Sequence, residues 1–223
     1  MKVLAFDTST PWLSVAILDG EKTLVSFAMD GELRHSEYLT EVIEDALKYV
    51  PFSREELDLI AVGVGPGSYT GLRISLITAK ILARSLDIPV IGVSGLSAMA
   101  YVQEDGLYLP ALDARRKRVY WGLYRKTGQE LEVLVPDGVT AVGELDIPPE
   151  AVVLGSGYGA YPELFGDVAH RVAQVTAEAI GRYGLHSYGK RGGDNPYSLE
   201  PNYVQKTQAM REYEERNGPI EKN

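Results

Sequence analysis

An internal repeat constrains the fold of this chain more than any other feature of its sequence. Residues 2–6 form an apolar strand pattern that ends at Asp7, and a second apolar strand pattern ends at Asp113. In both places the next strand pattern begins six residues after the aspartate, at Leu13 and at Val119. Two copies of a strand, an acidic turn and a returning strand predict two similar lobes made by duplication.

The repeat extends beyond the first hairpin of each copy. Third strands are predicted at residues 23–29 and 131–135, and a further strand with a glycine turn recurs at 62–68 and 152–158. Each copy therefore predicts a βββαβα lobe of an α/β fold. The second copy is degenerate, because residues 136–150 lack an amphipathic helix pattern and are expected to form a loop with a turn of helix.

The predicted division is a first lobe at residues 1–104 and a smaller, divergent second lobe with a C-terminal tail at residues 105–223. Two such lobes resemble the ASKHA architecture of actin, hexokinase and Hsp70, in which two hairpins hold the phosphates of a nucleotide from opposite sides. For Asp7 the alternative is a turn residue that bonds its own backbone. The implied phosphate-loop residues are Asp7, Thr8, Ser9 and Asp113.

A glycine-rich loop at residues 65–71 joins an apolar strand pattern to an apolar helix pattern. Because glycine allows a close approach of other groups and a helix N-terminus favours anions, the loop is interpreted either as an anion site or as a tight turn. The duplicated lobes are expected to place it away from the two hairpins. This favours a structural role in directing the helix, with Ser68 or Thr70 as the cap. The loop residues are Gly65, Gly67, Ser68, Thr70, Gly71 and Arg73.

Two apolar helix patterns are candidates for a partner interface. Residues 36–49 have apolar positions at helical spacing and acidic residues on the other face. Residues 72–86 are apolar nearly all round, and such a helix is covered on more than one side. The second cover is predicted to be a partner chain; the alternative is that these residues only fill the core. The candidate partner-binding residues are Tyr38, Leu39, Val42, Leu72, Ile74, Ile77 and Ile81.

Composition narrows the possible function classes. The chain has 223 residues, a formal net charge of −9 and no cysteine. The acidic balance argues against a large nucleic-acid surface, and the lack of cysteine excludes thiol nucleophiles and thiolate metal sites. No run approaches the ~20 apolar residues of a membrane span, and the N-terminal segment lacks a signal-peptide pattern. A cytoplasmic protein without membrane contact is therefore expected.

Catalytic residue patterns are weak. A metal site on the first helix would use two histidines four residues apart, but Leu39 stands at that spacing from His35, and His170 and His186 lie far along the chain. No metal site is therefore predicted. The loop around Ser68 lacks the Gly-Xaa-Ser-Xaa-Gly pattern of a hydrolase nucleophile. An ATPase stays an alternative, because the two acidic hairpins and the second glycine turn could hold a nucleotide.

Several motifs occur together and in one order. They are Asp-Thr-Ser at 7–9, His-Ser-Glu at 35–37, Gly-Pro-Gly-Ser-Tyr-Thr-Gly-Leu-Arg-Ile at 65–74 and Asp-Ala-Arg-Arg at 113–116. This set resembles the TsaB (YeaZ) family of bacterial proteins, and the run at 65–74 is its most specific element. Glu-Pro-Asn-Tyr-Val at 200–204 is similar to the closing segment of that family.

The resemblance implies a non-catalytic subunit of the machinery that makes N6-threonylcarbamoyladenosine next to the tRNA anticodon. There the larger paralogue TsaD transfers the threonylcarbamoyl group, TsaB binds TsaD directly and is needed for its activity, and the ATPase TsaE completes the complex. The resemblance further implies a homodimer when the chain is alone, tRNA contact at most indirect, and ATP or ADP only in the complex. The alternative is a stand-alone ASKHA-type ATPase or phosphotransferase.

A dense basic run at residues 115–118 stands out in this acidic chain. It is interpreted as a solvated turn, as a contact with tRNA phosphates, or as a site for phosphate or an acidic partner helix. The sequence leaves these three interpretations open.

Overall fold

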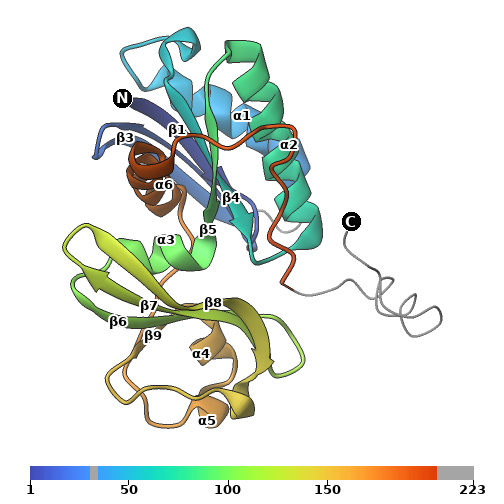
Figure 1. Cartoon of the computed structure of the whole chain (residues 1–223). Helices are drawn as coiled ribbons and strands as arrows, with labels where there is room; N and C mark the ends of the chain where they lie inside the picture. Colours follow the sequence, from blue (N-terminus) through green and yellow to red (C-terminus); the bar gives the residue numbers. More distant parts are fainter. Residues whose placement is uncertain (31–34, 205–223) are drawn as a thin grey trace.

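The computed structural model describes residues 1–30 and 35–204, and its strands form two five-stranded sheets, one in each lobe (Figure 1). The first sheet has the order β3-β2-β1-β4-β5. Its first three strands are antiparallel, whereas β4 and β5 run parallel to β1. The bounds are β1 (Lys2–Asp7), β2 (Trp12–Asp19), β3 (Lys22–Asp30), β4 (Leu59–Gly65) and β5 (Val90–Ser94).

The second sheet repeats this plan with the order β10-β9-β6-β7-β8. β6 is antiparallel to β7 and parallel to β9, as β1 is to β2 and β4. The matching order and directions confirm the predicted α/β fold with two duplicated lobes of the ASKHA type. The bounds are β6 (Gly106–Asp113), β7 (Arg118–Thr127), β8 (Glu130–Ala141), β9 (Val152–Leu154) and β10 (His170–Arg171).

Helices cover both faces of the first sheet. Alternate residues of β1 point to opposite faces, so Leu4 and Phe6 join one core cluster while Val3 and Ala5 join another. α1 (His35–Lys48) and α2 (Tyr69–Leu86) pack into the first cluster. α3 (Gly95–Tyr101) and α6 (Ala177–Arg191) pack into the second cluster. This explains why the strands are apolar at consecutive positions and do not alternate with polar ones.

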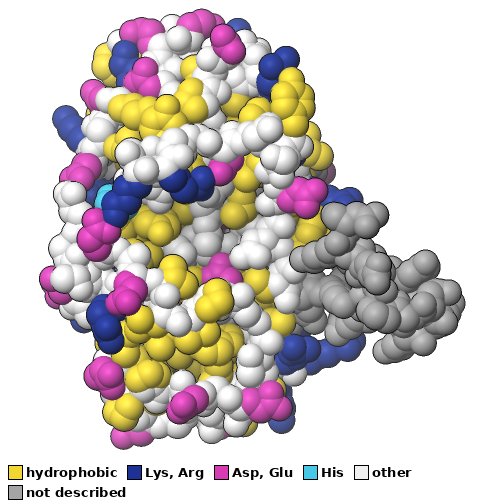
Figure 2. All heavy atoms as spheres, in the orientation of Figure 1, with side chains coloured by type: hydrophobic (Ala, Val, Ile, Leu, Met, Phe, Trp, Pro, Cys, Tyr) yellow, Lys and Arg dark blue, Asp and Glu magenta, His cyan; other side chains and the backbone are white. Residues whose placement is uncertain are grey.

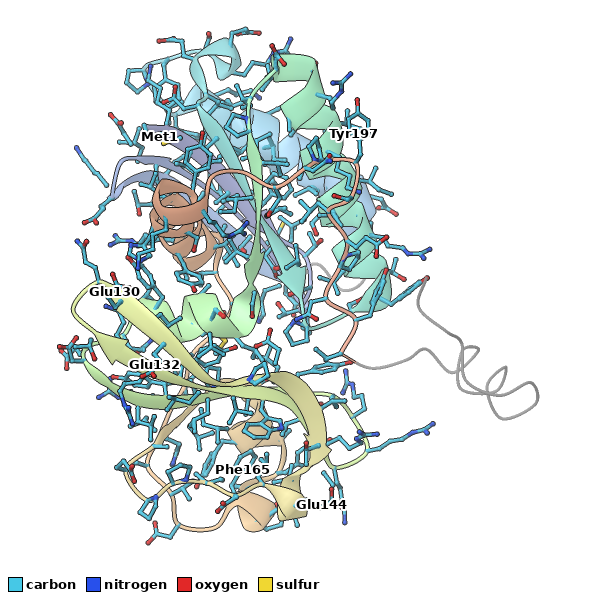
Figure 3. All side chains as sticks on the ribbon, in the orientation of Figure 1. Met1, Glu130, Glu132, Glu144, Phe165 and Tyr197 are labelled. Carbon is cyan, nitrogen blue, oxygen red and sulfur yellow. The ribbon has the colours of Figure 1, made fainter. Side chains whose placement is uncertain are left out.

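The second lobe carries only short helices. α4 (Ser156–Ala160) and α5 (Pro162–Phe165) pack against the second sheet, and Phe165 joins a core cluster with Leu109 and Val153 (Figure 3). Two 3-10 turns occur at Arg54–Glu56 and Val142–Glu144. In the described ranges no helix is both long and apolar enough to cross a membrane.

Two elements differ from the expectation. Residues 136–141 were predicted to be loop, but they extend β8. The pairing of β8 with β7 shifts register between Trp121 and Tyr124. A strand can contain a proline such as Pro136 at an irregularity of this kind. α6 was not predicted, since glycines lower the helix propensity of its sequence. It packs against β1, β2 and β4, so a segment from the second half of the chain completes the first lobe.

Residues 192–204, called the C-terminal strap here, return from α6 along the open edge of the first sheet (Figure 1). The backbone N–H of Asp194 donates to the carbonyl of Val90 at 2.8 Å, and its carboxylate accepts from the N–H of Gly92 at 2.8 Å. Further along, the N–H of Asn202 donates to the carbonyl of Val64 at 2.7 Å. At Val90 and Gly92 the strap therefore occupies backbone groups that the edge strand β5 would otherwise leave unpaired.

The packing of α6 yields a matched pair of glycine substitutions. A Cβ atom at Gly184 would lie 2.8 Å from the Cβ of Ala61 on β4, whereas one at Gly189 would meet nothing within 4 Å. We expect Gly184→Ala to lower the free energy of unfolding by about 1–3 kcal/mol through overpacking. Gly189→Ala should raise it by up to about 1 kcal/mol through helix propensity. Urea titration measures both, and equal effects would contradict this packing.

The start of α2 yields a second pair. The hydroxyl of Ser68 accepts from the N–H of Gly71 at 3.2 Å, so Ser68 is the cap, and Thr70 is an exposed residue of the first turn. We expect Ser68→Ala to lower the free energy of unfolding by about 1 kcal/mol. Thr70→Ala should change it by no more than about 0.5 kcal/mol, as is usual for exposed positions. If thermal or urea unfolding showed a larger loss of stability for Thr70→Ala than for Ser68→Ala, Thr70 would be the cap.

Candidate functional site

The glycine loop packs directly on the first hairpin loop. A Cβ atom at Gly67 would lie 2.2 Å from the carbonyl oxygen of Ser9, and one at Gly71 would lie 1.9 Å from that of Thr8. The N–H of Ser68 donates to Ser9 O at 2.7 Å, and the hydroxyl of Thr8 donates to Gly71 O at 2.7 Å. Only glycine allows a contact this close at residues 67 and 71.

The prediction that this loop lies away from the hairpins is therefore wrong for the first hairpin. β1 and β4 are parallel neighbours in the sheet. Their carboxyl ends must lie at the same edge, so the loop after β4 meets the loop after β1. The structural role predicted for the loop agrees with this contact, because it fixes where α2 begins.

The first of the two predicted phosphate loops is filled by the protein itself. Asp7, Thr8 and Ser9 are buried, with exposed fractions of 0%, 0% and 2%. One carboxylate oxygen of Asp7 accepts from both the N–H and the hydroxyl of Ser9, each at 2.9 Å. At the start of α2, the N–H of Gly71 and that of Leu72 are bonded to Ser68. These donors are thus already used within the chain and are not available to an anion.

The second predicted phosphate loop is also bonded internally. The carboxylate of Asp113 accepts from the N–H of Arg115 at 2.7 Å and from the hydroxyl of Tyr161 at 2.8 Å. Arg115, Arg116 and Lys117 follow with φ of 64°, 54° and 58°, which is the left-handed region. Their side chains are exposed, and the guanidinium of Arg115 lies 3.4 Å from Asp113. The three interpretations of this basic turn stay predictions.

No group of three or more His, Asp or Glu side chains is placed to hold a metal ion within residues 1–30 and 35–204. His170 stacks on Tyr158 with ring centroids 3.6 Å apart, and His186 lies 5.2 Å from the ring of Tyr101. These two histidines are therefore packed against aromatic rings in different lobes.

An apolar groove lies between α1 and α2. Its volume is about 470 Å³, and it is called the α1–α2 groove here. Ile77 is 56% exposed beside it, and Ile81, one turn further along α2, is 63% exposed. Two neighbouring isoleucines exposed on one face of a helix are more typical of a surface that binds a partner than of one that stays in contact with solvent. The lining residues are Leu39, Thr40, Tyr69, Thr70, Arg73, Ile74, Ile77 and Thr78.

The seven candidate partner-binding residues do not share one environment. Leu39 and Leu72 are each 1% exposed and fill the core, the alternative kept open for this group. Tyr38, Val42 and Ile74 are half-buried against the core cluster beneath α1 and α2. Only Ile77 and Ile81 among the seven present most of their apolar surface to solvent.

A cluster of aromatic and basic side chains borders the groove and was not predicted. Tyr203 of the strap stacks on Tyr69 with ring centroids 5.1 Å apart. The guanidinium of Arg73 lies 4.2 Å from the centre of the Tyr69 ring, and its Nε donates to the hydroxyl of Tyr203 at 3.2 Å. Arg73 therefore contacts aromatic rings, where the sequence suggested an anion site. The motifs at 65–74 and 200–204 contain all three residues, but nothing in the sequence joins them.

A second strap residue also reaches α2. The guanidinium of Arg84 lies 5.4 Å from the ring centre of Tyr197, which is labelled beside α2 in Figure 3 and is 74% exposed. With Tyr197 and Tyr203, the strap adds two exposed tyrosines along the α2 surface.

Hydrophobic side chains reach the surface over both lobes among interspersed charged side chains (Figure 2).

Comparisons with known proteins agree with this architecture. The model of the family TsaD, described as tRNA N6-adenosine threonylcarbamoyltransferase, matches residues 9–158, a range that begins after β1 and ends in α4. YeaZ from Pseudomonas aeruginosa superposes with a TM-score of 0.82 at 28% identity, covering 91% of this chain and 99% of that chain.

Several curated relatives share the name TsaB. The tRNA threonylcarbamoyladenosine biosynthesis protein TsaB of Escherichia coli (strain K12) is 32% identical over 174 residues, 74% of this chain and 75% of that protein. The protein of the same name from Bacillus subtilis (strain 168) is 40% identical over 139 residues, and the match spans 61% of each protein. These findings confirm the resemblance carried by the motifs: the chain belongs to the TsaB (YeaZ) family, and its relatives named TsaB are described as tRNA threonylcarbamoyladenosine biosynthesis proteins.

Proposed function

We propose that this chain is a non-catalytic subunit that binds and activates TsaD. In this proposal it acts with TsaD and TsaE in the transfer of a threonylcarbamoyl group to N6 of the tRNA adenosine next to the anticodon. The observation that carries the proposal is a contrast within the first lobe. The loop that would hold phosphate is filled by Thr8, Ser9 and the glycine loop, while the neighbouring helix exposes Ile77 and Ile81.

Catalysis by this chain has little support from its chemistry. Phosphoryl or carbamoyl transfer is accelerated by donors aimed at the charge that develops on the reacting group. In the first loop the hydroxyls of Thr8 and Ser9 and the N–H of Ser9 are bonded within the chain, and Asp113 is bonded to Arg115 and Tyr161. A nucleotide, ATP or ADP, is therefore proposed to bind only in the complex, and tRNA is proposed to be held through the partners.

The partner surface is proposed to be α2 with the α1–α2 groove. The TsaD family model matches 9–158 of this chain, so TsaD would present an equivalent helix pair. Two related helix pairs can pack face to face about a pseudo-twofold axis, as two identical ones do in a symmetric dimer. The same surface would therefore form a homodimer when TsaD is absent. Because the proposed complex acts on tRNA, it is proposed to work in the cytoplasm.

Reconstitution tests the function directly. Threonylcarbamoylation of tRNA is measured with TsaD, TsaE, the threonylcarbamoyl donor and ATP, with and without this chain. Omission should reduce the modification rate by at least about 100-fold, because the catalytic subunit lacks its required partner. The chain alone should not turn over ATP above the rate of an Asp7→Asn variant. Stand-alone turnover that Asp7→Asn removes would instead establish the ATPase alternative.

Charge substitutions test the surface. We expect Ile77→Glu and Ile81→Glu each to weaken TsaD binding at least about 100-fold, since each buries an unpaired carboxylate in the interface. Both positions are exposed in the free chain, so thermal unfolding should change little. The matched control is Val133→Glu, which introduces the same charge at an apolar residue of β8 that is 50% exposed. Normal TsaD binding by both isoleucine variants would place the interface elsewhere.

A further inference from the structure

We propose that the C-terminal strap is part of the TsaD-binding surface, and that the second lobe positions it through a hydrogen bond between Asn202 and Asp137. This inference rests on the proposed function, because it concerns the same partner. It adds a contact residue, Tyr203, and two positioning residues that lie outside α1 and α2. The partner surface then depends on both lobes and not on the first alone.

Tyr203 is built into the rim of the groove. Tyr203 is 41% exposed and Tyr69 is 40% exposed. Their rings stack on each other, and Tyr69 lines the α1–α2 groove. Arg73 contacts both rings, through its guanidinium over Tyr69 and its bond to the Tyr203 hydroxyl. Stacked tyrosines held by an arginine form a rigid, amphipathic surface, and Tyr and Arg are the side chains enriched at the energetic centres of interfaces.

The residue before Tyr203 is held at two points. The backbone N–H of Asn202 donates to Val64 O at 2.7 Å, which ties it to the end of β4. Its side-chain amide donates to the carboxylate of Asp137 on β8 at 3.1 Å, which ties it to the second lobe. Adjacent Cα atoms are about 3.8 Å apart, so a shift of Asn202 must move the Tyr203 backbone.

Asp137 collects hydrogen bonds from three parts of the molecule. Besides Asn202, it accepts from the hydroxyl of Ser94 at 2.6 Å, where β5 meets α3, and from the hydroxyl of Tyr124 on β7. Burial raises the pKa of Asp137, and these three donors oppose that rise by stabilising the carboxylate. A half-buried carboxylate needs its donors, so the Asn202 amide is held firmly and the strap follows the second lobe.

The charge on Asp137 also explains why an amide suits residue 202. Asn offers a neutral N–H₂ donor to the carboxylate and keeps its backbone N–H for Val64. Alanine at this position would retain the backbone bond and the edge cover of the sheet. It would remove only the link to the second lobe, so Asn202→Ala isolates the proposed positioning role from the fold of the strap.

The test measures TsaD affinity by calorimetry for the full chain and for Asn202→Ala, Tyr203→Ala and the double variant. Each single change should weaken binding about 10-fold, the usual size for loss of one ordered aromatic contact. The double variant should bind like Tyr203→Ala alone, because Asn202 acts through Tyr203. The matched control is Asp105→Ala, which removes a side-chain bond to the N–H of Gly128 and lies outside the strap, so its affinity should be unchanged.

The inference is overturned if Asn202→Ala binds TsaD normally, or if the two single effects simply add. It is also overturned if Asn202→Ala weakens self-association in sedimentation while TsaD affinity stays unchanged. Ile77→Glu, measured in parallel, separates the two proposals. If Ile77→Glu loses TsaD binding and Asn202→Ala does not, only the strap inference fails; if Ile77→Glu binds normally, the proposed surface itself is wrong.

Discussion

The close contact between the glycine loop and the first hairpin is the interaction on which the rest of the first lobe depends. Gly67 and Gly71 allow the backbone after β4 to reach the carbonyl groups of Ser9 and Thr8. The contact occupies the space and the donors of a phosphate loop, and it also fixes the first turn of α2. The filled loop after β1 and the placement of α2, whose outer face exposes Ile77 and Ile81, are therefore two consequences of one backbone approach.

The second lobe has a related but different glycine contact. A Cβ atom at Gly155 would lie 2.8 Å from the carbonyl oxygen of Ala111, which lies inside β6 and not in the loop after it. The helix that follows, α4, has 5 residues, whereas α2 has 18. Within the described residues, the helices that follow β9 in the second lobe are short, and β8, whose 12 residues include Asp137, reaches the strap. The two lobes thus share a strand framework but differ in the helix that follows the glycine turn.

The sequence predicted the elements that local patterns encode and missed those that depend on distant contacts. Strand periodicity, the aspartate spacing and the glycine turns were sufficient to predict the two duplicated lobes, whereas the family was recognised from the motif at 65–74 and those that accompany it. α6 was missed because its glycines weaken the helix pattern, while Gly184 is required by packing against Ala61, which lies far away in the chain. The outer face of α2 could not be separated from its core face, since isoleucine and leucine fit either environment. The stack of Tyr203 on Tyr69 joins two ends of the chain and leaves no local pattern.

The strap contacts elements that lie far from it in the sequence, and these contacts couple its position to both lobes. Its contacts link β4, β5, α2 and β8, so the strap has one stable position only while the two lobes keep their present relation. A partner that binds Tyr203 in this position also favours the arrangement of lobes that supports it. By thermodynamic reciprocity, anything that stabilises this arrangement of lobes must raise the affinity for that partner by the same factor. In the proposed complex, the second lobe would therefore influence the affinity of a partner surface to which it contributes only the position of the strap.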